Sequence, residues 1–358
     1  MKTCTNCILT EYYPNISFNE VGICNYCINH QKITYAGEEK LIRILEKYRK
    51  NDGNYDCIVT LSGGRDSSYT LLKLVKDYKM NVLAVNYQNP FTHPQAEINI
   101  KNAVKLLDVD LIKFSLKDDL HKKTMESSLN SWLKKPSASM IPIICMACKT
   151  IWYDIIKIAK NNHINCIVSG GSPIEDSSFK MKLLNLSENE DPKSHFTKSI
   201  FTITSEVLRN INYLNPVNFK TMIKGFLFGN PYALGSKIYG RSISKIDLFY
   251  YTEWKEEEVL SRIRSELNWS QPKDSKSTWR FDCKIGHLKD FMYAKTVRVS
   301  EKQDFYSKLI REGAITREIA LKKLKEEIHS DDNQLNSILE ELNIEDDSFF
   351  ENFNQSIL

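Results

Sequence analysis

The chain has 358 residues, of which 42% are hydrophobic and 26% charged, a composition typical of a soluble globular protein with a sizeable core. No apolar run approaches the length of a membrane-spanning helix, and the N-terminus lacks the basic and then apolar layout of a secretory signal. With neither feature present, we expect a cytoplasmic protein without a membrane partner.

The formal charge of +4 is unevenly distributed along the chain. Residues 321–358 carry a net charge of −7, which leaves +11 on the first 320 residues. A basic body suits polyphosphate or nucleic acid, although an excess of this size is also common on solvated surfaces. Nucleic-acid binding therefore stays open, but charge alone does not favour it.

The first thirty residues contain two CxxC pairs and little apolar periodicity, which indicates a small module. From residue 55 onward, buried strand patterns alternate with helical ones, and a helix follows the glycines at 63 and 64. The expected strands are 56–61, 82–85, 111–114, 166–168 and 246–250. The other expected helices are 37–50, 94–107, 151–160 and 256–267. This alternation predicts an α/β fold with a doubly wound parallel sheet.

A helical insertion at about 176–240 interrupts the alternation, and the chain is predicted to be helical from 289 to its end. The insertion could form a lid, a dimer interface or ordinary packing. We divide the chain into a zinc-binding module, a helical linker, an ATP-binding domain that contains the insertion, and a helical C-terminal region, with bounds 1–30, 31–54, 55–270 and 271–358.

The strongest motif joins the first strand to the next helix and reads Ser62-Gly63-Gly64-Arg65-Asp66-Ser67-Ser68. Two glycines let the backbone approach an anion, and the helix that follows adds its unpaired N–H groups. The serines supply hydroxyl donors, and Arg65 can offer a planar fork to phosphate oxygens. Asp66 suits a phosphate site only with Mg²⁺ between them. A plain tight turn before a helix is the alternative.

The loop is not a Walker motif, because the GxxxxGK[ST] spacing is absent. It resembles the SGGxDS signature of the PP-loop ATP pyrophosphatases, which implies an adenine nucleotide alpha hydrolase-like fold and a catalytic set of Arg65, Asp66 and Ser67. A second glycine turn, with Gly170 and Gly171, follows a later strand and looks like the turn that lines the nucleotide site in this fold. Asn86, at the end of the second strand, is a weaker candidate for the adenosine pocket.

Nine cysteines are many for a cytosolic chain, and metal binding explains them better than disulfides do. Two CxxC pairs separated by 16 residues predict a closed tetrahedral Zn²⁺ site with four ligands, Cys4, Cys7, Cys24 and Cys27. The strand residues Cys57 and Cys166 are expected to be buried apolar side chains.

A second set consists of Cys145, Cys148 and the distant Cys283. Three thiolates could hold three irons of a [4Fe–4S] cluster, as in the PP-loop tRNA thiolation enzymes; alternatively, the pair is a redox dithiol and Cys283 is unrelated. Arg280, Lys284 and Lys289, near Cys283 in sequence, could contact phosphate or an acidic substrate, or could be ordinary solvated charges. His93, His163 and His287 show no metal-ligand spacing.

Along nearly its whole length the chain is most similar to the N-acetyl sugar amidotransferase family of PP-loop enzymes. Three stretches carry this resemblance: the cysteine module 4–27, the strand and loop 55–67, and the helical stretch 309–318. The resemblance implies a role in surface-polysaccharide synthesis, a sugar substrate activated as its adenylate, and ammonia from a separate glutaminase subunit. The absence of a cysteine at position 2 fits such a partner.

The second cysteine set departs from this family, because amidation needs no iron–sulfur cluster. It favours an alternative in which sulfur, not nitrogen, replaces the activated oxygen of a tRNA or a small molecule. A third interpretation is a zinc-knuckle protein that binds nucleotide or nucleic acid without catalysis.

Overall fold

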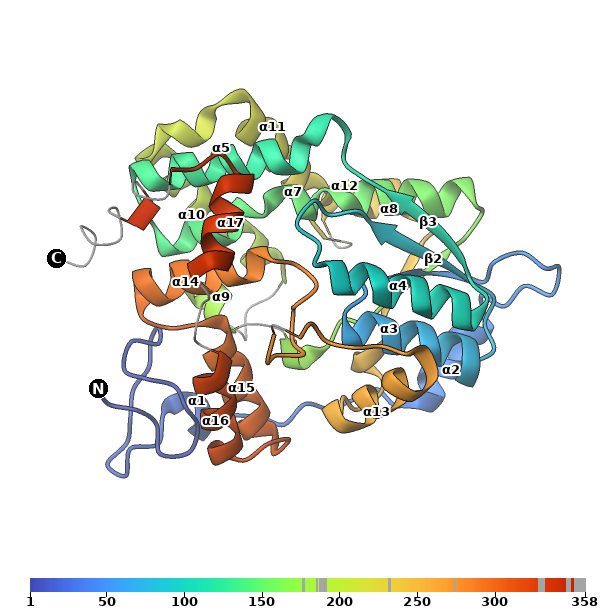
Figure 1. The fold of residues 1–358 in the computed structure, drawn as a ribbon, viewed down its shortest axis with the longest axis horizontal. Coiled ribbons are helices and arrows are strands. Elements are labelled where there is room, and N and C mark those ends of the chain that lie inside the picture. Colours follow the sequence, from blue (N-terminus) through green and yellow to red (C-terminus); the bar gives the residue numbers. More distant parts are fainter. Residues whose placement is uncertain are drawn as a thin grey trace.

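The computed structural model describes residues 1–175, 178–184, 186, 192–230, 233–273, 275–327, 332–345 and 349–350. Its centre is a five-stranded parallel sheet in the order β3-β2-β1-β4-β5 (Figure 1). The strands are β1 (Cys57–Thr60), β2 (Val82–Tyr87), β3 (Asp110–Phe114), β4 (Cys166–Ser169) and β5 (Ser244–Asp247). The predicted α/β class with a parallel sheet is therefore confirmed.

Helices cover both faces of the sheet, which explains why its central strands are continuously apolar. In β1, Cys57 and Val59 pack into one core cluster, whereas Ile58 packs into another on the opposite face. The first cluster is completed by α2 (Glu38–Glu46), α3 (Arg65–Leu72), α4 (Pro94–Leu107) and α13 (Glu256–Leu267). The second includes residues of α8 (Ile151–Asn161).

Local signals explain why two helices match their predicted bounds. In α4, Pro94 occupies the first turn and the His93 ring accepts a hydrogen bond from the Gln95 N–H, which caps the helix. Helix α13 begins with three glutamates, which favour the positive end of the helix dipole. The helix predicted at 37–50 is shorter and ends at Glu46.

The last predicted strand is wrong in its second half. Strand β5 ends at Asp247, and residues Leu248–Tyr250 form a 3₁₀ turn, η6. Leu248 and Phe249 are fully buried in the core cluster, as strand residues would be. A short apolar run looks alike in a buried strand and in a buried turn, so periodicity could not separate the two.

Most of the remaining helical segments form a second group of helices beside the sheet (Figure 1). The described part of residues 176–240 is mostly helical, and the described chain after residue 289 is also mostly helical, as the sequence predicts for that C-terminal region. The segments are α1 (Asn25–Ile28), η1 (Lys73–Asp77), η2 (Lys117–Asp119), α5 (Leu120–Lys134), η3 (Ala138–Met140), α6 (Ile141–Ile144), α7 (Met146–Lys149), η4 (Pro173–Glu175), α9 (Ser178–Leu183), α10 (Pro192–Arg209), η5 (Ile211–Leu214), α11 (Pro216–Phe228), α12 (Leu234–Tyr239), α14 (Ile285–Val297), α15 (Glu301–Glu312), α16 (Arg317–Glu327) and α17 (Asp332–Glu341).

Among the described residues, no single helix is long and apolar enough to cross a membrane. One helix pair, Ala138–Ile144 with Met146–Asn161, passes the same test by length and composition but bends by 59° at its break. Most of the first segment and part of the second are buried in the protein core.

Candidate functional site

The two glycine turns meet at the point where the order of the strands in the sheet reverses. The chain runs from β1 outward to β3 and then crosses back to place β4 on the other side of β1. Ligands of open α/β sheets bind in the crevice at such a switch point. Gly63 has φ +83°, and a Cβ there would lie 2.3 Å from the Ala96 carbonyl oxygen. A Cβ on Gly170 would lie 2.8 Å from the Asp66 carbonyl group. Both glycines are therefore required by close backbone contact.

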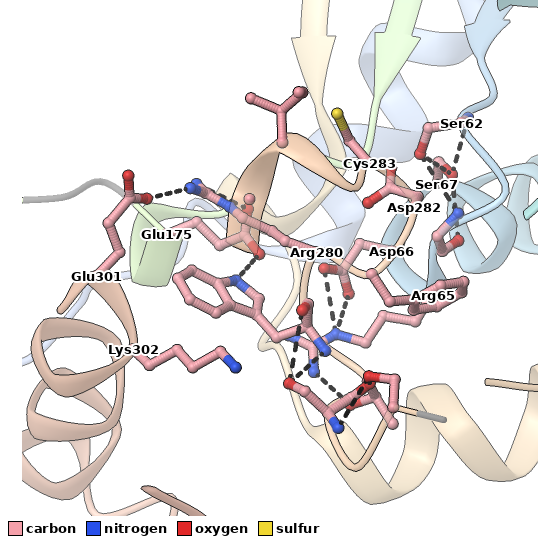
Figure 2. A pocket seen from close by; sticks show the side chains of 18 of the residues that line it. Ser62, Arg65, Asp66, Ser67, Glu175, Arg280, Asp282, Cys283, Glu301 and Lys302 are labelled. Atoms are coloured by element: carbon pink, nitrogen blue, oxygen red, sulfur yellow. Dashed lines mark hydrogen bonds and ion pairs between the residues drawn. The ribbon is translucent and has the colours of Figure 1, made fainter. Parts of the chain in front are cut away.

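A cavity of about 480 Å³ opens at this edge of the sheet (Figure 2). The phosphate loop forms one side, and a segment around residues 275–290 with the start of α15 forms the other. Nine predicted site residues line the cavity: Ser62, Gly64, Arg65, Asp66, Ser67, Cys145, Gly170, Gly171 and Cys283. Four others lie outside its lining: Gly63, Ser68, Asn86 and Cys148.

The loop serines differ in what they can reach. The hydroxyls of Ser62 and Ser67 lie 3.1 Å apart at the cavity, and Ser67 also accepts the Ser62 N–H at 3.2 Å. Ser68 is fully buried and its hydroxyl has no partner. An anion in the cavity therefore meets Ser62 and Ser67, whereas the predicted contact with Ser68 is not available there.

The Arg65 guanidinium is partly committed to the protein. Its Nη1 donates to Glu256 and to Thr278, each at 2.9 Å, and its carbon lies 4.6 Å above the Trp254 ring. Its Nη2 is buried without a hydrogen-bond partner. The phosphate fork predicted from the sequence is thus partly committed within the protein, and the two N–H groups of the buried Nη2 have no partner.

The Asp66 carboxylate is a buried acid with few donors. Trp254 donates its indole N–H to Oδ1 at 2.8 Å, and the Arg65 Nε lies 3.4 Å away. The pKa of Asp66 is raised to about 6, chiefly by burial and also by the nearby Glu175, whereas Arg65 and Trp254 lower it. The charged form is therefore under-compensated, a condition that a cation at the carboxylate would relieve.

A second carboxylate beside the loop was missed by sequence reasoning. Asp282 lines the cavity, and a Cβ added to Gly64 would lie 3.5 Å from its Oδ2. Its backbone oxygen accepts the His93 N–H at 3.1 Å, which fixes the segment against the start of α4. Burial raises the pKa of Asp282, whereas a hydrogen bond from Ser62 lowers it. Figure 2 shows Asp282 beside Ser62 and Ser67.

The far side of the cavity carries paired charges. Arg280 contacts Glu301 at 2.7 Å, and Lys289 lies 3.6 Å from the same carboxylate. These cations lower the pKa of Glu301 to about 2 despite its burial. Lys284, predicted beside them, is instead paired with Glu341 at 2.8 Å and does not line the cavity.

A smaller cavity of about 160 Å³ adjoins the loop and contains Asn86. The Asn86 Nδ2 donates to the Leu61 carbonyl oxygen at 2.8 Å, whereas its Oδ1 is buried without a partner. Val85 and Ile151 add apolar walls. This cavity therefore suits a flat group that has apolar faces and one hydrogen-bond donor for the Asn86 Oδ1.

The three cysteines of the second set lie near one another, but not as ligands of one ion. Their proximity raises the pKa values of Cys148 and Cys283, after the larger effect of burial. Among the described residues, only the N-terminal cysteines converge within 4.8 Å. Thiolates of an iron–sulfur cluster bind separate irons and are spaced more widely. The Cys148 sulfur also lies 3.3 Å from the Nε2 of His121, a buried histidine that the sequence did not mark.

The four N-terminal cysteines form a compact cluster. The Cys4 and Cys27 sulfurs are 3.9 Å apart and those of Cys7 and Cys24 are 3.8 Å apart. A tetrahedron with Zn–S distances of about 2.3 Å has edges of about 3.8 Å, so the donor set fits Zn²⁺. The Arg317 Nε donates to the Cys7 carbonyl oxygen at 3.1 Å, which ties the module to α16.

No protein-family model matches the chain. Two uncharacterised proteins of Methanocaldococcus jannaschii are similar to it in sequence. One is 32% identical over 117 residues, which are 30% of this chain and 41% of that protein. The other is 28% identical over 144 residues, which are 39% of this chain and 45% of that protein. The chain thus spans less than half the length of these relatives.

Two solved structures show a distant likeness. A U34-tRNA thiolase of Methanococcus maripaludis, solved with its [4Fe–4S] cluster, is 14% identical with a TM-score of 0.34, over 92% of this chain and 90% of that one. An NMN synthetase of Francisella tularensis is 13% identical with a TM-score of 0.28, over 66% of this chain and 96% of that one.

Proposed function

We propose that the chain is a PP-loop ATP pyrophosphatase that adenylates an oxygen of its substrate. The observation that carries this proposal is the position of the glycine loop and Asp66 at the switch point, where both line one cavity. The exposed N–H groups of the loop and the start of α3 suit a polyphosphate. Ser62 and Ser67 add hydroxyl donors on the same side.

The nucleotide would occupy both cavities, with its triphosphate in the larger one and its adenine in the smaller one. The triphosphate would lie against the loop, and the unpartnered Nη2 of Arg65 would donate to one of its oxygens. Adenine would occupy the smaller cavity, where its amino group can donate to the Asn86 Oδ1. The free acceptor and the free donor would each gain a partner, which removes the cost of burying them unpaired.

The loop also provides a place for Mg²⁺. Asp66 and Asp282 supply hard carboxylate oxygens, which Mg²⁺ prefers, and burial, which raises the pKa of each, would favour a cation beside them. When bound, the ion would neutralise charge on the phosphates. The protein itself would position the α-phosphorus for attack and stabilise the departing pyrophosphate.

For the group transferred, we propose nitrogen. A carboxyl or amide oxygen of an N-acetylated sugar would attack the α-phosphorus, and pyrophosphate would leave. Ammonia from a glutaminase subunit would then attack the carbon that bears this oxygen, and the C–O bond would break to release AMP. This agrees with the sequence resemblance to N-acetyl sugar amidotransferases and with their role in surface-polysaccharide synthesis. Trp279, which lines the cavity and stacks on Phe305 with centroids 4.4 Å apart, offers a rigid wall for a sugar ring.

The test is pyrophosphate release from ATP, measured with candidate N-acetyl sugars and ammonia. We expect Asp66→Ala to abolish release and Asp52→Ala, at an exposed carboxylate, to leave it unchanged. Unchanged release in Asp66→Ala would contradict the PP-loop proposal. A wild-type chain that binds ATP but releases no pyrophosphate with any acceptor would support the non-enzymatic zinc-knuckle alternative.

Sulfur transfer is the second candidate, because Cys145 and Cys283 line the same cavity as Asp66. It predicts a brown protein with about four irons per chain after anaerobic purification. Cys283→Ser should remove that iron, whereas Cys166→Ala, in β4, should retain it. A colourless protein that contains only zinc would contradict sulfur transfer and leave amidation.

A further inference from the structure

The insertion exposes an unusual amount of apolar side chain. Nineteen large hydrophobic residues of the described chain are strongly exposed, and nine of them fall within residues 201–238. We call these nine residues the apolar surface. Its members are Phe201, Leu208, Ile211, Leu214, Phe219, Ile223, Leu227, Leu234 and Ile238, at 41–78% exposure. Single exposed hydrophobic residues need no explanation, but such a concentration marks an interaction site.

Helix α11 carries apolar side chains on its exposed face as well as on its buried face, where Met222 belongs to a core cluster. Phe219, Ile223 and Leu227 recur every four residues and so share one exposed face. The opposite face buries Asn218 and Thr221 at 1% exposure each. A soluble helix usually places its apolar stripe inward, so packing within this chain does not explain the exposed one.

The buried face of α11 packs on α5 and α7, and polar contacts to α5 are part of this packing. The Thr221 hydroxyl lies 3.2 Å from that of Thr124, and the Ser128 hydroxyl donates to the Asn218 Oδ1 at 3.0 Å. Hydrogen bonds thus hold α11 in this orientation, because rotating the helix would leave these buried groups unpaired. The exposed apolar stripe is therefore a fixed feature of the fold.

Charge identifies the partner. Residues 198–241 contain six basic side chains and one acidic one, a net charge of +5, although the whole chain carries only +4. Lys220, Lys237 and Arg241 are exposed. Lys220 directly follows Phe219, and Lys237 directly precedes Ile238, so the lysines border the apolar side chains. Two copies joined through this surface would bring like charges together, which disfavours a homodimer here.

We propose that the apolar surface, together with the exposed Lys220, Lys237 and Arg241, is a docking surface for an anionic lipid membrane. Phenylalanine, leucine and isoleucine side chains would enter the boundary between headgroups and acyl chains, while the flanking lysines would contact anionic headgroups. The protein would lie on the membrane without crossing it. No membrane partner is expected from the sequence, so the exposure of these side chains is what changes the expectation. The proposal is independent of the ATP chemistry.

Co-sedimentation of the full chain with lipid vesicles tests it. We expect binding to vesicles of phosphatidylcholine with about 30% phosphatidylglycerol, weaker binding at high salt, and little binding to phosphatidylcholine alone. Replacing Phe219, Ile223 and Leu227 by serine should weaken binding at least about tenfold. Lys220→Ala and Lys237→Ala should each weaken it about fivefold.

The control is Ile319→Ser with Leu321→Ser on α16, where two apolar side chains are equally exposed outside the basic segment. These changes should leave vesicle binding intact, and thermal melting should show that every variant is folded. The proposal fails if the wild type does not bind anionic vesicles or binds neutral vesicles equally well. It also fails if the triple variant binds anionic vesicles as tightly as the wild type does. It also fails if light scattering shows a dimer that the triple variant abolishes, since the surface would then bind a second copy.

Discussion

Trp254 donates its indole N–H to the Asp66 Oδ1 at 2.8 Å, although 188 residues separate the two in the chain. The same indole ring supports the Arg65 guanidinium, 4.6 Å from its centroid. One side chain before α13 therefore fixes both charged residues of the loop. It also supplies one of the few donors that keep a buried carboxylate ionised.

The first prediction concerns the pH dependence of pyrophosphate release. Since the pKa of Asp66 is raised to about 6 and a cation needs the ionised form, activity should rise with pH through that value. Trp254→Phe removes a donor that lowers the pKa, so the rising limb should move to higher pH. Trp132→Phe removes a buried indole donor elsewhere and should not move it. If the rising limb of the pH profile did not move in Trp254→Phe, ionisation of Asp66 would not control the activity.

The second prediction is that the ATP-free protein is stabilised when Asp66 loses its charge. The folded-state pKa lies above the usual 3.8, so the folded chain holds the proton more tightly, and the free energy of unfolding falls as pH rises from about 4 to 6. In Asp66→Asn the side chain cannot ionise, so the variant does not lose this stability, which amounts to at most about 3 kcal/mol at neutral pH. Denaturant titrations should show a more stable variant at pH 7.5 and a shrinking difference toward pH 4. A variant that is less stable at pH 7.5 would contradict this account.

Sequence reasoning located the elements with strong local signals and missed the contacts that bring distant segments together. The strand before Ser62 and the glycines after it are readable because a buried strand, a tight turn and a helix start each leave a local pattern. Asp282 and Trp254 leave none, since each is a single residue in irregular chain whose position depends on tertiary contacts. Arg65 shows the same limit. Its residue type predicts a contact with phosphate, but its Nη1 instead donates to Glu256, which lies far along the chain.

The third prediction separates backbone strain from steric contact in the loop. Gly63 and Gly53 have nearly the same left-handed backbone, with φ +83° and +81°. A Cβ at Gly63 would lie 2.3 Å from the Ala96 carbonyl oxygen, whereas a Cβ at Gly53 would lie in open space. Gly53→Ala should cost about 1–2 kcal/mol for the backbone alone. Gly63→Ala should cost more and should also weaken ATP binding. Equal losses of stability would mean that the loop relaxes away from α4.

The fourth prediction concerns the N-terminal cysteines. Elemental analysis should find about one zinc ion per chain. Cys24→Ser should lose that zinc and destabilise the contacts of the module with α15 and α16, because a structural zinc site folds with its metal. Cys57→Ala, in β1, should keep the zinc. If Cys24→Ser retained both zinc and thermal stability, the cluster would not be a four-ligand site.

The fifth prediction tests Asp282 as a second carboxylate for the metal that accompanies ATP. Asp282→Asn should weaken binding of Mn²⁺ with a non-hydrolysable ATP analogue about tenfold or more, as measured by calorimetry and by the electron paramagnetic resonance of Mn²⁺. Without metal, the same variant should bind the nucleotide at least as well as the wild type, because a negative charge beside the phosphates has been removed.

Asp290→Asn is the matched control for that measurement. Asp290 lines the same cavity, and burial raises its pKa to about 6 as it does for Asp66, but its carboxylate accepts the backbone N–H of Glu301 on the far side. It should therefore leave Mn²⁺ binding unchanged. If Asp290→Asn weakened Mn²⁺ binding and Asp282→Asn did not, the metal would lie at the far side of the cavity. Asp282 would then act only by placing its segment against the loop, and Asp66 alone would contribute a carboxylate beside the phosphates.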